Sequence, residues 1–591
     1  SVNILHYFYS NFQSKLMKKI IVLWFLFVAM ICKAQKLETT FEKSKGKETT
    51  TYFNCIEFYQ QLAASFKNIH IQKMGLTDAG YPLHLVLVSS NNNFNPNNWH
   101  KAEKVVVLIN NGIHPGEPDG IDATMMLVRD VATKKIVLPN NVVLGIIPIY
   151  NIGGSLNRNT SSRVNQDGPI SYGFRGNAQN LDLNRDFIKY DSKNATSFAE
   201  IFHFLNPDIF IDNHVSDGAD YQHTMTLLTT QQNKLGGVIG NFLHNNFEPA
   251  LYKSMKAKNW PMCPYVNFET ANPDKGWEAF YDGPRYSSGY AALFATMAFV
   301  PETHMLKPFE QRTKTTYALM QTMIEQASIW ATQIKQARTE SLKNIQQQKN
   351  FALSWKVDTT KFDTIEFLGY ESAYKKSDVT GKDRLFYNHE KPFTKKVKFY
   401  NYFVGEKTIE IPKAYIIPKG WHKVIDLLKL NDVKMFSLQK DTTIFVTAYK
   451  IEDYKSINRP YEKHFKHLTV KLKEVEQQIH FLKGDMVVYT NQTTNRFLVE
   501  TLEPEADDSY FKWNFFDAIL QQKEGYSDYR WEDVAEKYLA ENPTLKTILE
   551  EKKKTDTAFA NNAAAQLNFV YKNSPYYEAA HLRYPIYKLK Y

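Results

Sequence analysis

Residues 105–117 read VVVLINNGIHPGE, a run of apolar β-formers that passes directly into a turn containing two glycines and a proline. The apolar run is typical of a buried strand, because it lacks the polar alternation of a strand with one wet face. His114 and Glu117 lie three residues apart in the turn, and both are residue types that ligate metal ions. The same spacing recurs at His100 and Glu103, but in a polar loop without a glycine turn. We therefore choose His114 and Glu117 as candidate metal ligands.

Further strand-like runs flank this stretch and alternate with helical segments. A helix is predicted from Pro118-Asp119, because a proline in the first turn and an aspartate beside it favour a helix start. The expected strands are 83–88, 105–109, 142–147, 209–211 and 295–300, the last ending in Pro301-Glu302. A long amphipathic helix is expected from about 312 to 348. Continuous β-branched runs between helices predict an α/β domain whose sheet is covered on both faces.

The length and composition indicate a multidomain globular protein. A chain of 591 residues is too long for one ordinary core, and we expect a first domain at 36–348 and a second region at 349–591. Short alternating runs such as 396–400 and 408–411 predict that the second region is a β-rich accessory region with some helix. The formal charge of +10 is spread over Lys-rich segments without arginine-rich blocks, so nucleic acid is not an expected partner.

The N-terminal residues predict export to the periplasm or the extracellular space. Met17-Lys18-Lys19 precedes twelve apolar residues, which are too few to span a bilayer, and a small residue follows at Ala34. We interpret 17–34 as a signal peptide and 1–16 as an upstream extension, and we expect no membrane segment in the mature chain. The alternative is a lipoprotein signal that uses Cys32, but the residue before it is bulkier than such sites usually accept.

Two cysteines, Cys55 and Cys263, remain after the predicted cleavage. They could form one disulfide bond, and the sequence leaves open whether they pair. Two cysteines cannot form a network of disulfide bonds, so the hydrophobic core must hold the fold together. The same count excludes a zinc knuckle built from cysteine and histidine.

Two polar residues at predicted strand ends could complete a catalytic metal site, which needs three protein ligands and one open position. His214 follows the apolar run 209–211, although an ordinary strand-end histidine is the simpler interpretation of this residue taken alone. Glu302 follows the run 295–300. Burial at such a position raises the pKa of a carboxyl group, as a general base working near neutral pH requires.

Residues 180–187 read NLDLNRDF and lie between the two ligand segments. At this point the sequence resembles the zinc metallocarboxypeptidases of the carboxypeptidase A type. In that family His-x-x-Glu, an Asp-Leu-Asn-Arg-Asn-Phe-like segment, a histidine and a catalytic glutamate follow in the same order. The resemblance covers roughly residues 50–345 and implies a mixed central sheet flanked by helices. It also implies one Zn²⁺ per chain, bound by His114, Glu117 and His214.

The resemblance assigns roles to the remaining candidates. Glu302 corresponds to the catalytic glutamate, and Asn184 and Arg185 correspond to the residues that bind the free C-terminal carboxylate of a peptide substrate. Arginine offers a planar fork of donors and asparagine an amide donor, which suits that role. The alternative for Arg185 is a structural salt bridge. Asp182 could hold the outer ring nitrogen of His114 and thereby fix its tautomer.

Several positions depart from the family pattern or stay open. Asp186 stands where asparagine is commoner, and Ile152-Gly153 replaces the usual Pro-Asp. The candidates for an oxyanion-stabilising arginine are Arg158, Arg163 and Arg175. We prefer Arg175, whose spacing of nine residues before Asn184 is common in carboxypeptidases. The candidates for the family's mobile tyrosine are Tyr281, Tyr286 and Tyr290, among which the sequence does not choose.

These observations together predict an exported zinc carboxypeptidase that acts on peptides with a free C-terminal carboxylate. A zinc amidase or deacylase on the same scaffold is the first alternative, with peptidoglycan stem peptides or N-acyl amino acids as substrates. A non-catalytic surface-binding protein is the second alternative. The simultaneous presence of three ligands and Glu302 argues against it. The side-chain preference, the role of the C-terminal region and the oligomeric state stay open.

Overall fold

The computed structural model describes residues 37–266 and 272–591. The predicted signal peptide at 17–34, the upstream stretch 1–16 and Cys32 lie outside these residues. In the described part of the chain, no helix combines the length and the apolar character needed to cross a membrane. Cys55 and Cys263 are both buried, and neither forms a disulfide bond.

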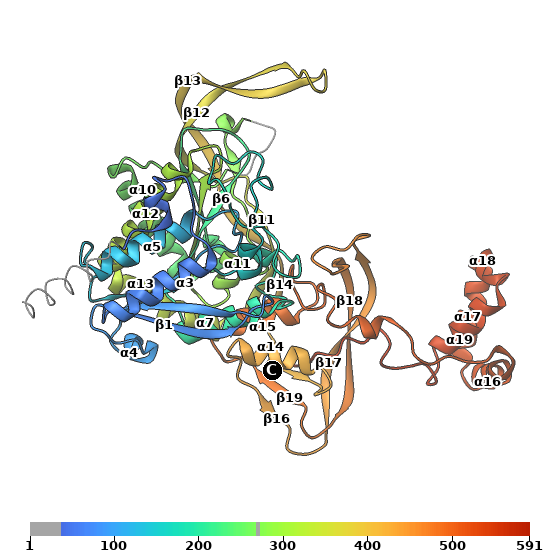
Figure 1. Cartoon of the computed structure of the whole chain (residues 1–591). Helices are drawn as coiled ribbons and strands as arrows, with labels where there is room; N and C mark the ends of the chain where they lie inside the picture. The colour runs from blue at the N-terminus through green and yellow to red at the C-terminus, as the bar shows by residue number, and fades with distance from the viewer. Residues whose placement is uncertain (1–36, 267–271) are drawn as a thin grey trace, which may run out of the picture.

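A mixed β-sheet lies at the centre of the N-terminal half (Figure 1). Among the described residues its strands are β1 (Ile69–Leu76), β2 (Pro82–Val88), β3 (Val105–Asn110), β4 (Val142–Ile147), β5 (Ile209–Asp212), β6 (His214–Ser216), β7 (Met225–Thr229), β8 (Cys263–Pro264) and β10 (Met297–His304). The order is β1-β2-β4-β3-β5-β10-β7-β8, and β6 pairs with β10 beyond the end of β5. β3 runs parallel to β4 and β5, whereas β10 runs antiparallel to β7.

Helices cover both faces of this sheet, because its central strands are apolar on both sides. In β3, Val105, Val107 and Ile109 point into one core and the intervening Val106 and Leu108 point into the other. The first core is closed by α3 (Tyr52–Ser65), α5 (Asp119–Ala132), α12 (Phe309–Ile329) and α13 (Ala331–Gln347). The second includes α7 (Lys193–Leu205) and α11 (Ser287–Ala292). The predicted α/β fold with a mixed, helix-flanked sheet is therefore confirmed.

β10 is longer than the strand expected at 295–300, because it continues through Pro301 to His304. On one side β10 pairs first with β5 and then with β6, and the break between those strands at Asn213 falls beside Pro301. Because the break leaves no strand residue to accept a hydrogen bond at this point, the missing N–H of Pro301 costs no hydrogen bond between strands. Glu302 consequently lies inside a strand and not in the loop after it.

The single long helix expected from about 312 to 348 is two helices, α12 and α13, which meet at Trp330. Trp330 has φ −99° and ψ 13°, outside the helical range. Its ring packs against Phe242, with 5.7 Å between the ring centroids. At the junction of the two helices, Trp330 is partly buried and packs against the first core.

The C-terminal region is β-rich, as predicted. Its strands are β11 (Asn350–Val357), β12 (Asp363–Lys376), β13 (Asp383–Tyr400), β14 (Phe403–Glu410), β15 (Ala414–Ile417), β16 (Phe436–Ser437), β17 (Thr442–Ser456), β18 (His467–Phe481), β19 (Met486–Tyr489) and β20 (Tyr587–Leu589). β12 and β13 form a long hairpin that projects from the body of the molecule (Figure 1). Tyr415, Trp513 and Tyr584 enter the second core beside the central sheet. One hydrophobic core therefore joins the two halves of the chain.

Four helices near the C-terminus stand apart from the rest of the molecule (Figure 1). They are α16 (Asp528–Glu541), α17 (Pro543–Thr555), α18 (Thr557–Ala560) and α19 (Ala563–Lys572). They have a small core of their own, which includes Trp531, Phe559 and Tyr571. The chain leaves the body after Ile519 and returns at Leu582, whose N–H donates to the Ile519 carbonyl at 2.9 Å.

Candidate functional site

The turn between β3 and α5 holds His114 and Glu117 in a fixed, buried position. Gly112 has φ 64°, a left-handed conformation that glycine adopts without a steric penalty. The Glu117 N–H donates to the His114 carbonyl at 2.8 Å and closes the turn. The side chains are almost removed from solvent, with 1% of His114 and 3% of Glu117 exposed.

The neighbouring strands bring His214 to this turn. β5, which pairs with β3, ends at Asp212, and β6 begins at His214. The side-chain amide of Asn213, between the two strands, donates to Asn111 Oδ1 in the turn at 2.8 Å. The imidazole rings of His114 and His214 consequently lie 5.0 Å apart, centroid to centroid.

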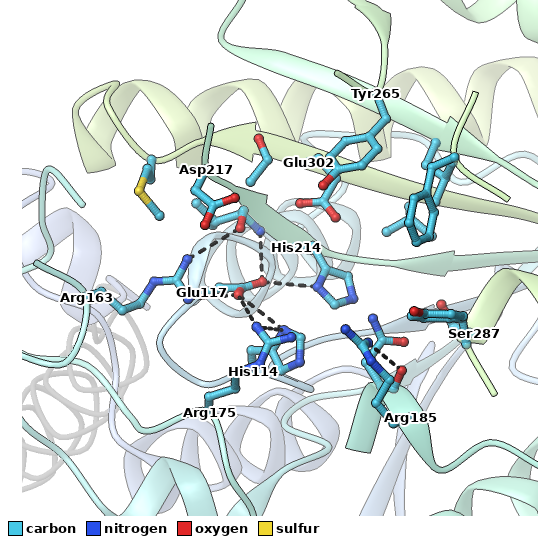
Figure 2. A pocket seen from close by; sticks show the side chains of 18 of the residues that line it. His114, Glu117, Arg163, Arg175, Arg185, His214, Asp217, Tyr265, Ser287 and Glu302 are labelled. Atoms are coloured by element: carbon cyan, nitrogen blue, oxygen red, sulfur yellow. Dashed lines mark hydrogen bonds and ion pairs between the residues drawn. The ribbon is translucent and has the colours of Figure 1, made fainter. Parts of the chain in front are cut away.

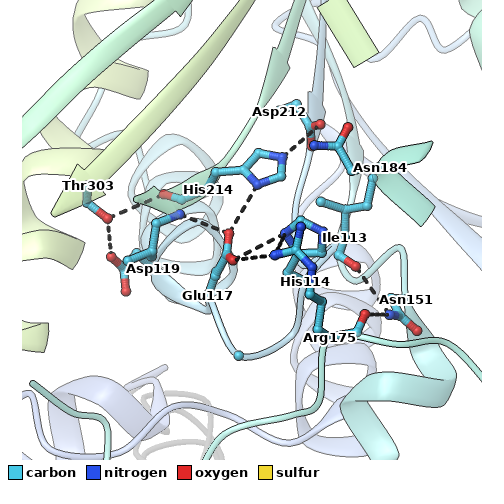
Figure 3. A network of polar contacts seen from close by, with 12 residues as sticks. Ile113, His114, Glu117, Asp119, Asn151, Arg175, Asn184, Asp212, His214 and Thr303 are labelled. Atoms are coloured by element: carbon cyan, nitrogen blue, oxygen red, sulfur yellow. Dashed lines mark hydrogen bonds and ion pairs between the residues drawn. The ribbon is translucent and has the colours of Figure 1, made fainter. Parts of the chain in front are cut away.

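His114, Glu117 and His214 each offer one ligand atom within 4.8 Å of the others (Figures 2 and 3). Nδ1 of His114 lies 3.2 Å from Glu117 Oε1, and Nδ1 of His214 lies 3.1 Å from Glu117 Oε2. The outer nitrogens are held by carboxylates. His114 Nε2 lies 2.9 Å from Asp182, and His214 Nε2 lies 3.1 Å from Asp212. A carboxylate on the outer nitrogen fixes each ring and leaves the inner nitrogen for a metal ion.

The donor set fits Zn²⁺, which takes two imidazoles and a carboxylate in many catalytic sites and keeps a fourth position for water. Burial alone would lower the pKa of His214, but the Asp212 carboxylate holds it well above its ordinary value. At Glu117, burial alone would raise the pKa of the carboxyl. His114 and Arg163 outweigh burial and hold this pKa well below its ordinary value. A divalent cation bound here would take the place of the proton on His214, because a histidine ligates metal ions in its neutral form.

Glu302 lies beside His214, because β10 and β6 run parallel with these two residues in register. Burial raises the pKa of Glu302 to about 8, even though the neighbouring His214 lowers it. A carboxyl with a raised pKa accepts and returns a proton more readily near neutral pH than an ordinary glutamate does. Figure 2 shows the Glu302 carboxylate facing the same space as the three candidate ligands.

A cavity of about 540 Å³ lies over the candidate ligands. Seven of the predicted site residues line it, namely His114, Glu117, Arg175, Asn184, Arg185, His214 and Glu302. Asp182 is the remaining predicted residue, and it contacts His114 from behind. The structure thus brings together residues from four separate segments of the sequence.

Arg175 reaches the candidate ligands from a loop that is tied to the ligand turn. Its Nη1 lies 3.3 Å from His114 Nδ1, and its Nη2 forms an ion pair with Asp182 at 2.8 Å. The amide of Asn151 donates to the carbonyls of Ile113, at 3.2 Å, and Arg175, at 2.9 Å (Figure 3). One asparagine thus couples the position of the arginine to the position of the turn.

Arg163, which we did not prefer, also lines the cavity. Its Nη1 donates to Glu117 Oε1 at 2.9 Å. Gly116 leaves room for it, since a Cβ at this glycine would lie 2.7 Å from the Arg163 Cδ. Arg158 instead donates to two main-chain carbonyls, at 3.1 and 2.7 Å. Among the three candidate arginines, the structure therefore places two beside the ligands.

Asn184 and Arg185 lie in a short 3₁₀ turn, η1 (Leu183–Arg185), which borders the cavity. Asp182 Oδ1 accepts the Asn184 N–H at 2.9 Å and begins the turn. Arg185 Nη1 donates to the Asn184 carbonyl at 2.8 Å. The Arg185 guanidinium lies over the Tyr286 ring, 4.5 Å from its centroid. The alternative of a simple salt bridge for Arg185 is weak, because its distance to Asp182 is 3.9 Å.

Asp186, which departs from the family pattern, has a local structural reason. Its carboxylate is fully buried and lies 3.0 Å from the ammonium group of Lys189, which is also fully buried. It also accepts the Ser192 N–H at 2.9 Å. An asparagine here would leave a buried lysine with less compensating charge.

The structure distinguishes the three candidate tyrosines. Tyr286 lines the cavity. Tyr290 is fully buried in the second core, and Tyr281 packs against Phe403 at 5.5 Å between centroids. Tyr265, which the sequence did not single out, also lines the cavity (Figure 2).

Asp282 is another cavity residue that the sequence analysis missed. It is 7% exposed and accepts a hydrogen bond from the Ser288 hydroxyl. Burial raises its pKa to about 6. A weak signal existed, since Asp282 lies within the tyrosine-rich segment already expected at the site, but single aspartates in loops are common.

Comparisons with known proteins point to one family. Residues 55–207 match the family model described as zinc carboxypeptidase. The chain is 21% identical over 427 residues to carboxypeptidase 2 of Trichophyton equinum, an alignment that covers 69% of this chain and 73% of that protein. It is likewise 21% identical over 448 residues to carboxypeptidase 2 of Trichophyton rubrum, covering 73% of this chain and 77% of that protein.

Solved structures with weaker similarity carry related names. A metallo-carboxypeptidase from Burkholderia cenocepacia aligns with a TM-score of 0.34 and 17% identity, over 47% of this chain and 68% of that chain. Carboxypeptidase A from Helicoverpa armigera aligns with a TM-score of 0.35 and 16% identity, over 48% of this chain and 74% of that chain. The assignment to a family rests on the sequence matches.

Proposed function

The chain belongs to the zinc carboxypeptidase family through residues 55–207, and from this premise we propose that it is an exported zinc-dependent carboxypeptidase that removes C-terminal residues from peptides. The observation that carries the proposal is the convergence of three ligand atoms beside Glu302. His214 and Glu302 lie beyond the matched residues, so the geometry supports them independently of the family match. One Zn²⁺ per chain would be held by His114, Glu117 and His214.

The proposed roles follow from the position of each side chain. Bound zinc supplies Lewis acidity towards a water molecule and a carbonyl oxygen. Glu302 accepts the proton of the attacking water and delivers it to the departing amine. Arg175 donates to the oxyanion that develops on the scissile carbonyl. Asn184 and Arg185 donate to the terminal carboxylate of the peptide and set the position of the bond to be cut.

Replacing the general base tests the proposal most directly. We expect Glu302→Gln to lower kcat by about 10³-fold, because amide oxygens do not accept the water proton. Zinc content, measured by mass spectrometry of the dialysed protein, should equal that of the wild type, since Glu302 is not a ligand. A variant that keeps wild-type activity would refute the assignment of Glu302.

The state of the substrate carboxylate separates the two enzymatic alternatives. A carboxypeptidase should cleave a peptide with a free C-terminus and leave the amidated peptide intact, because the amide removes the charge that Arg185 recognises. Cleavage of both peptides at similar rates would favour an amidase or deacylase.

N-terminal sequencing of the mature protein from the envelope tests the proposed export, with cleavage near Ala34 as the expected result.

A further inference from the structure

A tight turn from the C-terminal region reaches the segment that carries Asn184 and Arg185. Tyr461 and His464 exchange two main-chain hydrogen bonds, at 2.9 and 3.0 Å, across a two-residue hairpin. The central residues Glu462 and Lys463 have φ 47° and 59°. Two consecutive left-handed residues define a type I′ turn, in which Asn-Gly is the favoured sequence. Glu-Lys is an unfavourable choice for this backbone, and such strain points to a function for the side chains.

The side chains of this turn contact the segment 182–191. The Tyr461 hydroxyl accepts a hydrogen bond from Arg185 Nε at 2.9 Å. Glu462 Oε2 accepts the Asp182 N–H at 2.9 Å. His464 Nε2 lies 2.7 Å from Asp191 Oδ2. Three polar contacts therefore join residues far apart in the sequence.

Lys463 makes a weaker contact than its neighbours. Its ammonium group lies 3.5 Å from Asp191 Oδ1, and 49% of the side chain is exposed. Solvent screens an ion pair of this kind. Lys463 therefore serves as an internal control for the turn.

The other side of the turn rests on Trp513. The Tyr461 ring stacks on the Trp513 ring, at 6.2 Å between centroids and 22° between planes. Trp513 is fully buried, and its indole N–H donates to Asp508 Oδ1 at 3.1 Å. The turn is thus held on a rigid support within the C-terminal region.

The contacts of the turn restrict Arg185 and Asp182. Tyr461 occupies Arg185 Nε while Tyr286 lies against the guanidinium face, so the plane of the guanidinium is fixed from two directions. Glu462 fixes the main chain of Asp182, whose carboxylate holds both the Asn184 N–H and His114 Nε2. Both proposed carboxylate-binding residues thereby depend on the turn.

We propose that Tyr461 and Glu462 are positioning residues, through which the C-terminal region prepares Asn184 and Arg185 to bind the terminal carboxylate of the substrate. This inference rests on the proposed carboxypeptidase function. A donor that is already oriented loses less freedom when the substrate binds, so the turn contributes to substrate affinity. Glu462 reaches the Asp182 N–H from this strained turn, and the side chain of the favoured Asn is one carbon shorter.

The first test removes one hydroxyl group from the full-length, zinc-loaded protein. Tyr461→Phe keeps the ring on Trp513 and deletes the hydrogen bond to Arg185 Nε. We expect KM for a free-acid peptide to rise about 10-fold with kcat within about twofold of wild type, because the carboxylate is bound in both the ground and transition states. Zinc content should be unchanged. kcat/KM for the free-acid peptide should therefore fall by about the same factor as KM rises.

The second test separates positioning from stability. Glu462→Asn suits the left-handed backbone but loses the contact with Asp182, so we expect the melting temperature to stay or rise while KM rises about 5-fold. Lys463→Gly relaxes the same turn and keeps Glu462. We expect it to raise the melting temperature and leave KM at the wild-type value. If the turn had only a structural role, KM would rise in either variant only together with a fall in the melting temperature.

The outcomes distinguish this inference from the function on which it rests. If the wild type does not hydrolyse free-acid peptides, the proposed function fails. If the wild type is active and both Tyr461→Phe and Glu462→Asn keep the wild-type KM, the positioning role fails while the function stands. A loss of kcat at constant KM in Tyr461→Phe would also overturn the positioning role, because it would place the effect on the chemical step.

Discussion

Residues 111–118 and residues 182–191 both border the cavity, yet the first segment is anchored by its own sheet and the second by a turn 276 residues further along the chain. The ligand turn leaves β3 and enters α5 within a few residues, and Asn213 of the adjacent strand holds it. The segment 182–191 contains little regular structure apart from η1 and relies on Glu462, Tyr461 and His464. The candidate metal ligands are thus positioned mainly by the central sheet, with Asp182 as a further support of His114. Asn184 and Arg185 depend more strongly on the C-terminal region.

The largest effect on hydrolysis should come from removing a candidate metal ligand, which belongs to the part of the site that the central sheet anchors. We expect His214→Ala to lose zinc on dialysis and to reduce hydrolysis to background, because two protein ligands remain where three are needed. Metal analysis and peptide hydrolysis measure the two consequences. His100→Ala is the matched control, since His100 belongs to the other His-x-x-Glu pair and contacts the Leu205 carbonyl at 2.9 Å. Normal zinc content in His214→Ala would contradict the ligand assignment.

A substitution in the segment 182–191, which the C-terminal region anchors, should weaken substrate binding and leave metal binding intact. We expect Arg185→Lys to keep zinc and to raise KM for a free-acid peptide about 100-fold, because lysine lacks the planar fork. kcat should change little, and steady-state kinetics separate the two parameters. Arg530→Lys, on the exposed face of α16, should behave as wild type. Loss of zinc in Arg185→Lys would show that the two parts of the site are not separable.

The smallest expected effect is on the enzyme's preference for the side chain of the C-terminal residue of the substrate. Burial raises the pKa of Asp282 to about 6, so its carboxyl is neutral below that pH and anionic above it. An anion in the cavity favours a cationic C-terminal residue. We expect the ratio of kcat/KM for Lys-ended over Phe-ended peptides to rise a few-fold between pH 5 and pH 7, roughly the range in which such a group titrates. In Asp282→Asn the ratio should be flat, and a ratio that still rises with pH would exclude Asp282.

The local part of the site could be predicted from the sequence because its signals are close together. The continuous apolar run at 105–109 predicts a buried strand, which the structure has as β3, and the turn after it carries two candidate ligands. His214 and Glu302 could be predicted only by combining their positions at strand ends with the resemblance to the zinc carboxypeptidases, because a strand-end histidine or glutamate is ambiguous by itself. Glu302 lies inside β10, however, because the break between β5 and β6 tolerates Pro301. That compensation depends on a neighbouring strand and has no trace in the local sequence.

The remainder depends on contacts between distant residues. Arg163 and Arg175 are both arginines in loops, and their places beside Glu117 and His114 follow from the way the loops pack. Tyr461 and Glu462 lie in a polar stretch that suggests only a turn. Their contacts with Arg185 and Asp182 exist because the C-terminal region shares the second core with the central sheet. A sequence read segment by segment does not reveal such packing.

The helices α16 to α19 leave and rejoin the body at adjacent residues, since the Leu582 N–H donates to the Ile519 carbonyl. In topological terms the intervening chain is an insertion whose two ends already touch. We expect that it can vary in length, or be excised and its ends joined, without altering the order of the strands. The final strand β20 then still returns to pair with β15 and β17, because the point of re-entry is fixed by the body and not by the helices. We therefore expect that the chain between Ile519 and Leu582 can be exchanged for another sequence while the cavity and the turn at Tyr461–His464 stay unchanged.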